Sequence, residues 1–160
     1  IIAAMVLFFY FPNALTFLLS VVVIGSRQFA LAVLAHDGAH NLLFSSEKIN
    51  DFASQWFCAF PIFSDNRPYR TYHLTHHRFT ESENDPDISL SAPFPITKAS
   101  FRRKVIRDLT GQTGFKRYSI ALKSIFSSEA DNFKGKIKKI SDKISGFLIT
   151  NLVIFSLITY

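Results

Sequence analysis

All five histidines of this 160-residue chain lie between positions 36 and 77, in two short groups. The first group is His36 and His40, and the second is His73, His76 and His77. Residues three or four positions apart share one face of an α-helix, so each group would present its imidazoles together. Imidazole is a ligand for iron, zinc, copper and nickel. The spacing therefore predicts a metal site with these five histidines as candidate ligands.

The number of candidate ligands bears on the kind of metal site. A catalytic zinc ion usually takes three protein ligands, so five imidazoles indicate two metal ions, or one ion with further histidines around it. A metal-bound imidazole normally donates its other N–H to an acceptor. Asp37, Asp85 and Asp87 are the nearby candidates for that role. A surface charge and an ordinary Asp-Pro turn are the alternative interpretations of these aspartates.

The stretch that leads into the first histidine group has the length and composition of a membrane span. Residues 14–35 form an apolar run with only Arg27 and Gln28 strongly polar. As a helix this run would be about 33 Å long, enough to cross a bilayer. Residues 1–11 are also apolar, and Pro12-Asn13 separates the two runs, which predicts a membrane hairpin. Residues 145–160 carry no charge and predict the start of a further span.

The segment between the apolar runs is polar and becomes strongly basic. Residues 47–63 mix charges with large aromatics, which is typical of a segment at the membrane interface. Residues 64–100 contain four prolines, so we expect no long helix there. Residues 98–143 hold 13 Lys/Arg and 4 Asp/Glu, and residues 99–109 and 134–144 read as basic amphipathic helices on an anionic leaflet. Nucleic-acid binding is disfavoured because this basic block leads directly into an apolar run.

The basic block also predicts the orientation in the membrane. Positive charges concentrate in cytoplasmic loops, so residues 36–144, with both histidine groups, are expected on the cytoplasmic side. Residues 14–35 would then run inward, and 145–160 back outward. Because both ends lie in apolar runs, we interpret residues 1–160 as one partial domain of an integral, multi-pass membrane protein, an all-α helical bundle cut at both ends. Cys58 is the single cysteine, which excludes an intrachain disulfide and a cysteine metal cluster.

Three sequence motifs resemble those of the membrane fatty acid desaturases and related hydroxylases. They are H-D-G-A-H, Y-R-T-Y-H-L-T-H-H-R-F-T and D-P-D, and the similarity covers roughly residues 25–120. The resemblance implies that His36, His40, His73, His76 and His77 ligate two non-haem iron ions. Such a centre would use O2 to desaturate the acyl chain of a lipid, with electrons from a ferredoxin, rubredoxin or cytochrome.

The family also has a third histidine box, and no histidine follows His77 in this chain. We expect that box beyond Tyr160, and we expect this piece alone to be inactive and to bind iron poorly. Three alternatives stay open: a related hydroxylase or ketolase acting on a carotenoid, alkane or sphingolipid, a membrane zinc peptidase, and a metal transporter. The peptidase motif H-E-x-x-H would have Asp37 in place of its glutamate, and an aspartate reaches a zinc-bound water less well.

Overall fold

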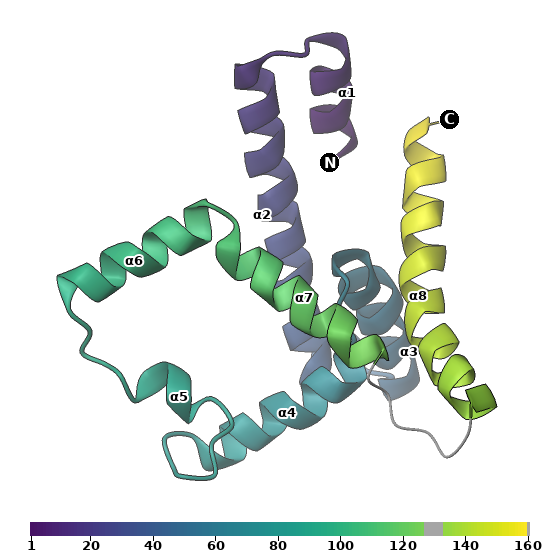
Figure 1. Ribbon diagram of the computed structural model, residues 1–160. Helices are drawn as coiled ribbons and strands as arrows, with labels where there is room; N and C mark the ends of the chain where they lie inside the picture. The colour runs from purple at the N-terminus through teal and green to yellow at the C-terminus, as the bar shows by residue number, and fades with distance from the viewer. Residues whose placement is uncertain (127–132, 160) are drawn as a thin grey trace. The chain divides into compact units, whose positions relative to one another are not determined.

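The computed structural model describes residues 1–126 and 133–159, and this part of the chain consists of helices and connecting turns without a strand (Figure 1). The all-α prediction is therefore confirmed for the described residues. The elements in chain order are α1 (Ile2–Tyr10), α2 (Ala14–Ala39), α3 (Glu47–Ala53), the π-helix η1 (Ser54–Ala59), the 3-10 helix η2 (Phe60–Ile62), α4 (Asn66–Phe79), α5 (Ile88–Ser91), α6 (Lys98–Leu109), α7 (Gln112–Phe126) and α8 (Phe133–Thr159).

The helices group into two compact units. The first comprises Ile1–Leu74 together with Gly146–Tyr160, and the second comprises Thr75–Ser145. Each boundary falls inside a continuous helix, namely α4 and α8. The expectation of a single partial domain over residues 1–160 stays a prediction.

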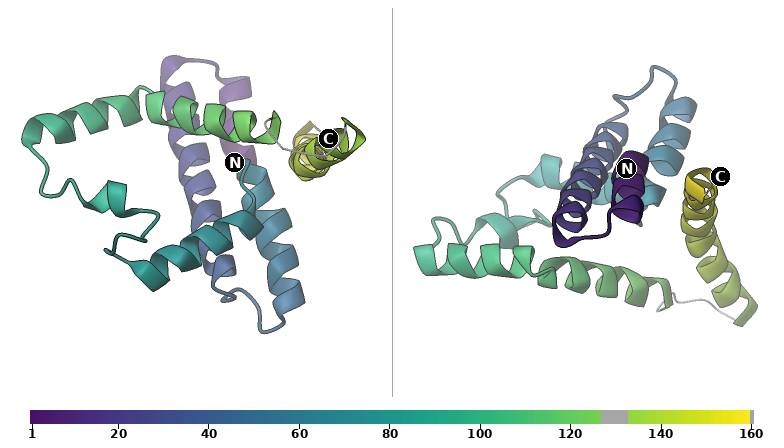
Figure 2. Two further views of the ribbon diagram at one scale, coloured as in Figure 1. Left: turned by 60° about the horizontal axis from the view of Figure 1, so that its bottom comes forward. Right: turned by 90° about the horizontal axis from the view of Figure 1, so that it is seen from above.

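Helices α1 and α2 form the expected hairpin, and they lie side by side in Figures 1 and 2. Asn13 caps α2, because its side-chain oxygen accepts hydrogen bonds from the backbone N–H groups of Leu15 (3.0 Å) and Thr16 (3.1 Å). The Thr16 hydroxyl in turn lies 3.2 Å from the Asn13 backbone nitrogen, which completes a capping box. Further along the hairpin, the Ser20 hydroxyl donates to the Ala4 carbonyl at 2.7 Å. These hydrogen bonds give polar groups of the hairpin partners within the protein, so that these groups do not need water.

Helix α2 fits a membrane span by length and composition. It has 26 residues, its most apolar 18-residue stretch has a mean hydropathy of 2.0, and only 6% of that stretch is buried. Helix α1 has nine residues and is too short to cross a bilayer. Among the described residues, α2 is the one helix that meets the requirement for a span. The expected multi-pass topology and its cytoplasmic sidedness stay predictions.

The C-terminal basic and apolar segments form one helix instead of two elements. Helix α8 runs from Phe133 to Thr159 without interruption, and its apolar portion is Ile144–Leu157. The separate helices expected over 134–144 and 145–160 are therefore joined, because no proline lies between them and a single glycine, Gly146, is tolerated within a helix. Within the first unit, Gly146 lies against the Phe60 ring, and the Phe60 and Phe147 rings pack edge to face at 5.2 Å.

The segment 47–63 packs against the C-terminal half of α2. Ala59 is fully buried and forms a small core with Ala35 and Cys58, and Leu43 packs beside it. Burial raises the pKa of the Cys58 thiol, so it behaves as an inert packing group. The rings of Phe52 and Phe57 stay exposed. Their placement at a membrane interface stays a prediction.

Residues 64–100 contain a longer helix than their prolines suggest. Helix α4 has 14 residues and carries the second histidine group. Pro68 is tolerated because it lies in the first turn, where the backbone N–H has no partner within the helix. In the second unit, α6 is a basic amphipathic helix as expected, and Phe101, Ile106 and Leu109 on it are exposed.

Candidate metal centre

The first histidine group lies at the C-terminal end of the candidate span. His36 is in the last turn of α2, and His40 caps the helix with a backbone N–H that points to the Asp37 carbonyl at 3.1 Å. The carbonyl end of a helix carries a partial negative charge, which favours a cation. The fold therefore brings two potential imidazole ligands and a favourable dipole to the same place.

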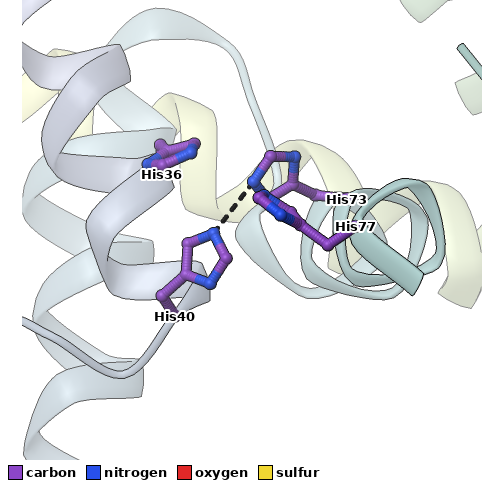
Figure 3. Close-up of side chains that lie close together, drawn as sticks. All are labelled: His36, His40, His73 and His77. Atoms are coloured by element: carbon purple, nitrogen blue, oxygen red, sulfur yellow. Dashed lines mark hydrogen bonds between the residues drawn. The ribbon is translucent and has the colours of Figure 1, made fainter. Parts of the chain in front are cut away.

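Three imidazoles from two helices meet within the first unit. His36 and His40 come from the end of α2 and His73 from α4, and their ring centroids lie 4.6–4.9 Å apart. The Nε2 atoms of His40 and His73 face each other at 3.0 Å (Figure 3). Two nitrogens that bind one ion at ~2.1 Å and at right angles would be separated by about 3.0 Å. The spacing of these two atoms thus fits adjacent ligands of one metal ion.

His77 follows His73 by one turn of the same continuous helix, so both rings lie on one face of α4 (Figure 3). His36, His40 and His73 each offer a ring nitrogen within the first unit, and these three atoms lie within 4.8 Å of one another. We call these three residues together with His77 the four-histidine group. Tyr69 stacks on the His73 ring, with centroids 5.1 Å apart and planes 11° apart. The sequence analysis missed Tyr69, although its i, i+4 spacing from His73 was visible.

His76 has different neighbours from the other four histidines. Its Nδ1 lies 2.7 Å from a carboxylate oxygen of Asp85 and 3.7 Å from one of Asp87. Asp85 is buried and also accepts backbone N–H bonds from Glu81 (2.9 Å) and Asp87 (2.8 Å). This arrangement fixes the orientation of the imidazole through Nδ1. His76, Asp85 and Asp87 form a second group of potential ligands.

The contact between His76 and Asp85 changes the pKa of both groups. Burial raises the pKa of Asp85, but the bonds from His76 and from two backbone N–H groups outweigh burial and lower it overall. The pKa of His76 is raised, chiefly by its hydrogen bond to Asp85 and also by the charges of Asp85 and Asp87, against an opposing effect of desolvation. Because a metal binds neutral imidazole, protons would compete with a metal that His76 ligates.

The structure thus divides the predicted ligands into two sets. Asp85 and Asp87 lie beside His76 as acceptors, and Asp37 lies 3.2 Å from His36 Nδ1 with both side chains partly exposed. The role of all five histidines as metal ligands stays a prediction. The sequence analysis also missed the contacts of a polar cluster next to the first histidine group, which is built around the buried Asn50 and the half-buried Arg70.

The model of one family, described as fatty acid desaturase, matches residues 12–159 of the chain. The chain belongs to the fatty acid desaturase family. The resemblance seen in the histidine motifs is therefore confirmed over most of the chain, and it extends beyond residues 25–120.

A curated desaturase supports this assignment over a shorter stretch. The chain is 36% identical over 72 residues to the dihydrorhizobitoxine desaturase of Bradyrhizobium elkanii. The match covers 44% of this chain and 20% of that protein, so the chain spans about a fifth of this relative. No solved structure matches the chain.

Proposed function

We propose that this chain is part of an O2-dependent, iron-containing oxidoreductase that desaturates the acyl chain of a lipid. The observation that carries the proposal is the pair of facing Nε2 atoms of His40 and His73, which lie 3.0 Å apart although the two residues are 33 positions apart in the sequence. Family membership supports the same chemistry.

The donor set fits iron. The four-histidine group offers only neutral nitrogen ligands, which suit a divalent transition metal and leave its charge largely uncompensated. Iron, when bound, supplies the activation of O2 and the removal of hydrogen from an unactivated C–H bond. His36, His40, His73 and His77 would hold the metal from one side. His76 would join through Nε2 while Asp85 holds its Nδ1 and fixes the direction of the ring.

We propose an integral membrane protein with the histidines on its cytoplasmic side. Support comes from α2, whose length and hydropathy suit a span and whose C-terminal end carries His36 and His40. The excess of Lys/Arg in residues 98–143 favours the cytoplasm for that segment. A site at the end of a span is well placed for a substrate whose acyl chain lies in the bilayer. Electrons would come from a ferredoxin, rubredoxin or cytochrome.

The proposal can be tested by expressing the full-length protein in a host and analysing its lipids. We expect new acyl double bonds with the wild type and none with the double variant His40→Ala, His73→Ala. Leu74→Ala is the matched control, because Leu74 is an exposed neighbour of His73 on the same helix and is expected to retain activity.

Several outcomes would contradict the proposal. Identical lipid unsaturation with wild type and the double variant would exclude desaturation. A hydroxylated or keto product would identify the related hydroxylases or ketolases instead. Hydrolysis restored by zinc and not by iron would favour a peptidase, and metal uptake without O2 consumption would favour a transporter.

A further inference from the structure

We propose that Arg70 is a positioning residue that fixes the second histidine group on α4 (the second box) against the first histidine group at the end of α2 (the first box). The inference rests on the proposed function for the metal, whereas the contacts that carry it belong to the first unit alone. Arg70 lies three residues before His73, within one turn of α4. The side chain therefore connects the backbone beside one box directly to the other box.

One terminal nitrogen of Arg70 reaches three acceptors, which lie in or next to the first box and in the neighbouring helix α3. Its Nη2 donates to the Gly38 carbonyl at 2.9 Å, to the Asn41 side-chain oxygen at 3.0 Å and to the Asp51 carboxylate. Gly38 lies midway between His36 and His40, and Asn41 directly follows His40. The positive guanidinium also faces the negative end of the α2 dipole, which strengthens this contact.

Asn50 holds the same acceptors from α3 and is fully buried. Its Nδ2 donates to the Gly38 carbonyl at 2.8 Å and to the Asn41 side-chain oxygen at 3.0 Å. Its own oxygen accepts the backbone N–H of Leu43 at 3.0 Å. The end of α2 is therefore fixed twice, by Asn50 from α3 and by Arg70 from α4. Loss of Arg70 would remove the link to α4 and leave the contact with α3 in place.

The start of α4 is held by a second set of buried polar contacts. The Asn66 backbone N–H donates to the Gln55 side-chain oxygen at 3.0 Å, and its Nδ2 donates to the Ser54 hydroxyl at 2.9 Å. Three buried atoms of this cluster find no hydrogen-bond partner among the described residues: Gln55 Nε2, Asn66 Oδ1 and Arg70 Nε. Their residues line a cavity of about 60 Å³. A polar cavity of this size has room for ordered water, which would complete the cluster.

Polar contacts suit positioning because they are directional. An apolar contact between α2 and α4 would tolerate sliding, whereas a guanidinium bound to fixed carbonyl and carboxylate oxygens specifies one register. Lysine would keep the charge and has three donors on one nitrogen, but its ammonium is more strongly hydrated and lacks the fixed plane of the guanidinium. The distance of 3.0 Å between the Nε2 atoms of His40 and His73 depends on this register.

The experiment compares Arg70→Met and Arg70→Lys with the control Arg67→Met in the full-length protein. Arg67 is an exposed arginine one turn earlier on α4, so the control removes the same charge from the same helix. The readouts are iron affinity, the Mössbauer spectrum of bound ⁵⁷Fe, and hydrogen exchange of α4 in the metal-free protein. We expect Arg70→Met to lower iron affinity about 10–100-fold and to broaden the iron spectrum. Arg70→Lys should restore part of both, and Arg67→Met should match the wild type.

Hydrogen exchange separates this inference from the proposed function. An Arg70→Met protein with the wild-type iron affinity, iron spectrum and α4 exchange would overturn the positioning role. Wild-type protein that binds no iron through its histidines would overturn the proposed function. In that case faster α4 exchange in Arg70→Met, and not in Arg67→Met, would still support the connection between α2 and α4, and unchanged exchange would refute it.

Discussion

Two histidines of helix α4, His73 and His76, have neighbours of opposite chemical character. His73 faces other imidazoles and stacks on Tyr69, whereas His76 faces the carboxylates of Asp85 and Asp87. Imidazoles that crowd together with their ring nitrogens facing each other gain most from a shared cation. An imidazole bound to a carboxylate has its orientation fixed before any metal arrives, and is more basic. One short motif thus presents two kinds of potential ligand, which would differ in what they need from a metal.

The largest expected effect comes from removing an imidazole of the four-histidine group. His73→Ala should lower the iron affinity of the full-length protein by more than about 100-fold, because a ligand and its stacking contact are both lost. This loss exceeds the roughly 10–100-fold that is typical of removing a residue that only hydrogen-bonds to a metal ligand. Titration of metal-free protein with iron measures this loss. Leu74→Ala is the control, and equal iron affinity in both variants would place the metal elsewhere.

Asp85→Asn tests the role of the carboxylate that contacts His76. The variant keeps the size of the side chain but removes the charge that orients His76, so we expect iron affinity to fall about 10–100-fold. Asp87→Asn should have a smaller effect, because its carboxylate is 3.7 Å from His76 and that of Asp85 is 2.7 Å away. The same titration compares the two variants, and a larger loss in Asp87→Asn would reverse the assignment of the orienting group.

Gly38→Ala disturbs the four-histidine group without altering a histidine. A Cβ at this position would lie 2.2 Å from the Ser54 Cβ, so α2 and η1 would have to separate. We expect destabilisation of about 1–3 kcal/mol in thermal unfolding. Gly25→Ala on the same helix is the control, since a Cβ there meets nothing within 4 Å and alanine favours a helix by up to ~1 kcal/mol. Equal stability of the two variants would disprove the close contact at Gly38.

The smallest expected effect is a shift in pH dependence. The raised pKa of His76 means that protons compete with iron at a higher pH than for an ordinary histidine, whose pKa is about 6.5. Iron binding should weaken as the pH falls through that raised value, and Asp85→Asn should move the transition to lower pH. Iron titrations over a pH series measure the shift. A transition at the same pH in both proteins would show that His76 does not control it.

The metal-free protein should show the opposite dependence at this pair. The raised pKa of His76 contributes stability that is present below its unfolded pKa and is lost as the pH rises through the folded value. The lowered pKa of Asp85 contributes stability above its unfolded pKa that is lost as the pH falls through the folded value. The pair therefore stabilises the fold most between these limits, in mildly acidic solution.

The sequence was sufficient where periodicity or local chemistry decides the structure. Apolar runs around Pro12-Asn13 predicted the hairpin, and the spacing of the histidines predicted their helical faces. Asp85 was a candidate because a metal-bound imidazole needs an acceptor close in sequence. The separation of His76 from the four-histidine group was not predictable, since His76 and His77 are about 100° apart on a helix and only their neighbours decide which set each joins.

The contacts of the polar cluster around Asn50 and Arg70 could not be predicted from the sequence for a different reason. Asn50 and Arg70 belong to no repeating pattern, and Arg70 meets Gly38 across 32 residues. Isolated polar residues in a sequence look like surface positions, and burial alone distinguishes Asn50 from them. Helix α8 shows the converse error. A change in composition from basic to apolar suggested two elements, but the backbone hydrogen bonds of a helix do not depend on such a change.

The π-helix η1 has a consequence for how this family can vary. A π turn holds one residue more than an α turn, so η1 is equivalent to a single-residue insertion absorbed inside a helix. Deleting one residue there, with the wider turn becoming an α turn, would leave the helical segments before and after it in nearly the same rotational register. Asn50 and Phe60 would therefore keep their partners on either side of the deletion. We expect relatives to tolerate a one-residue difference in chain length at residues 54–59, with an α-helix in place of η1.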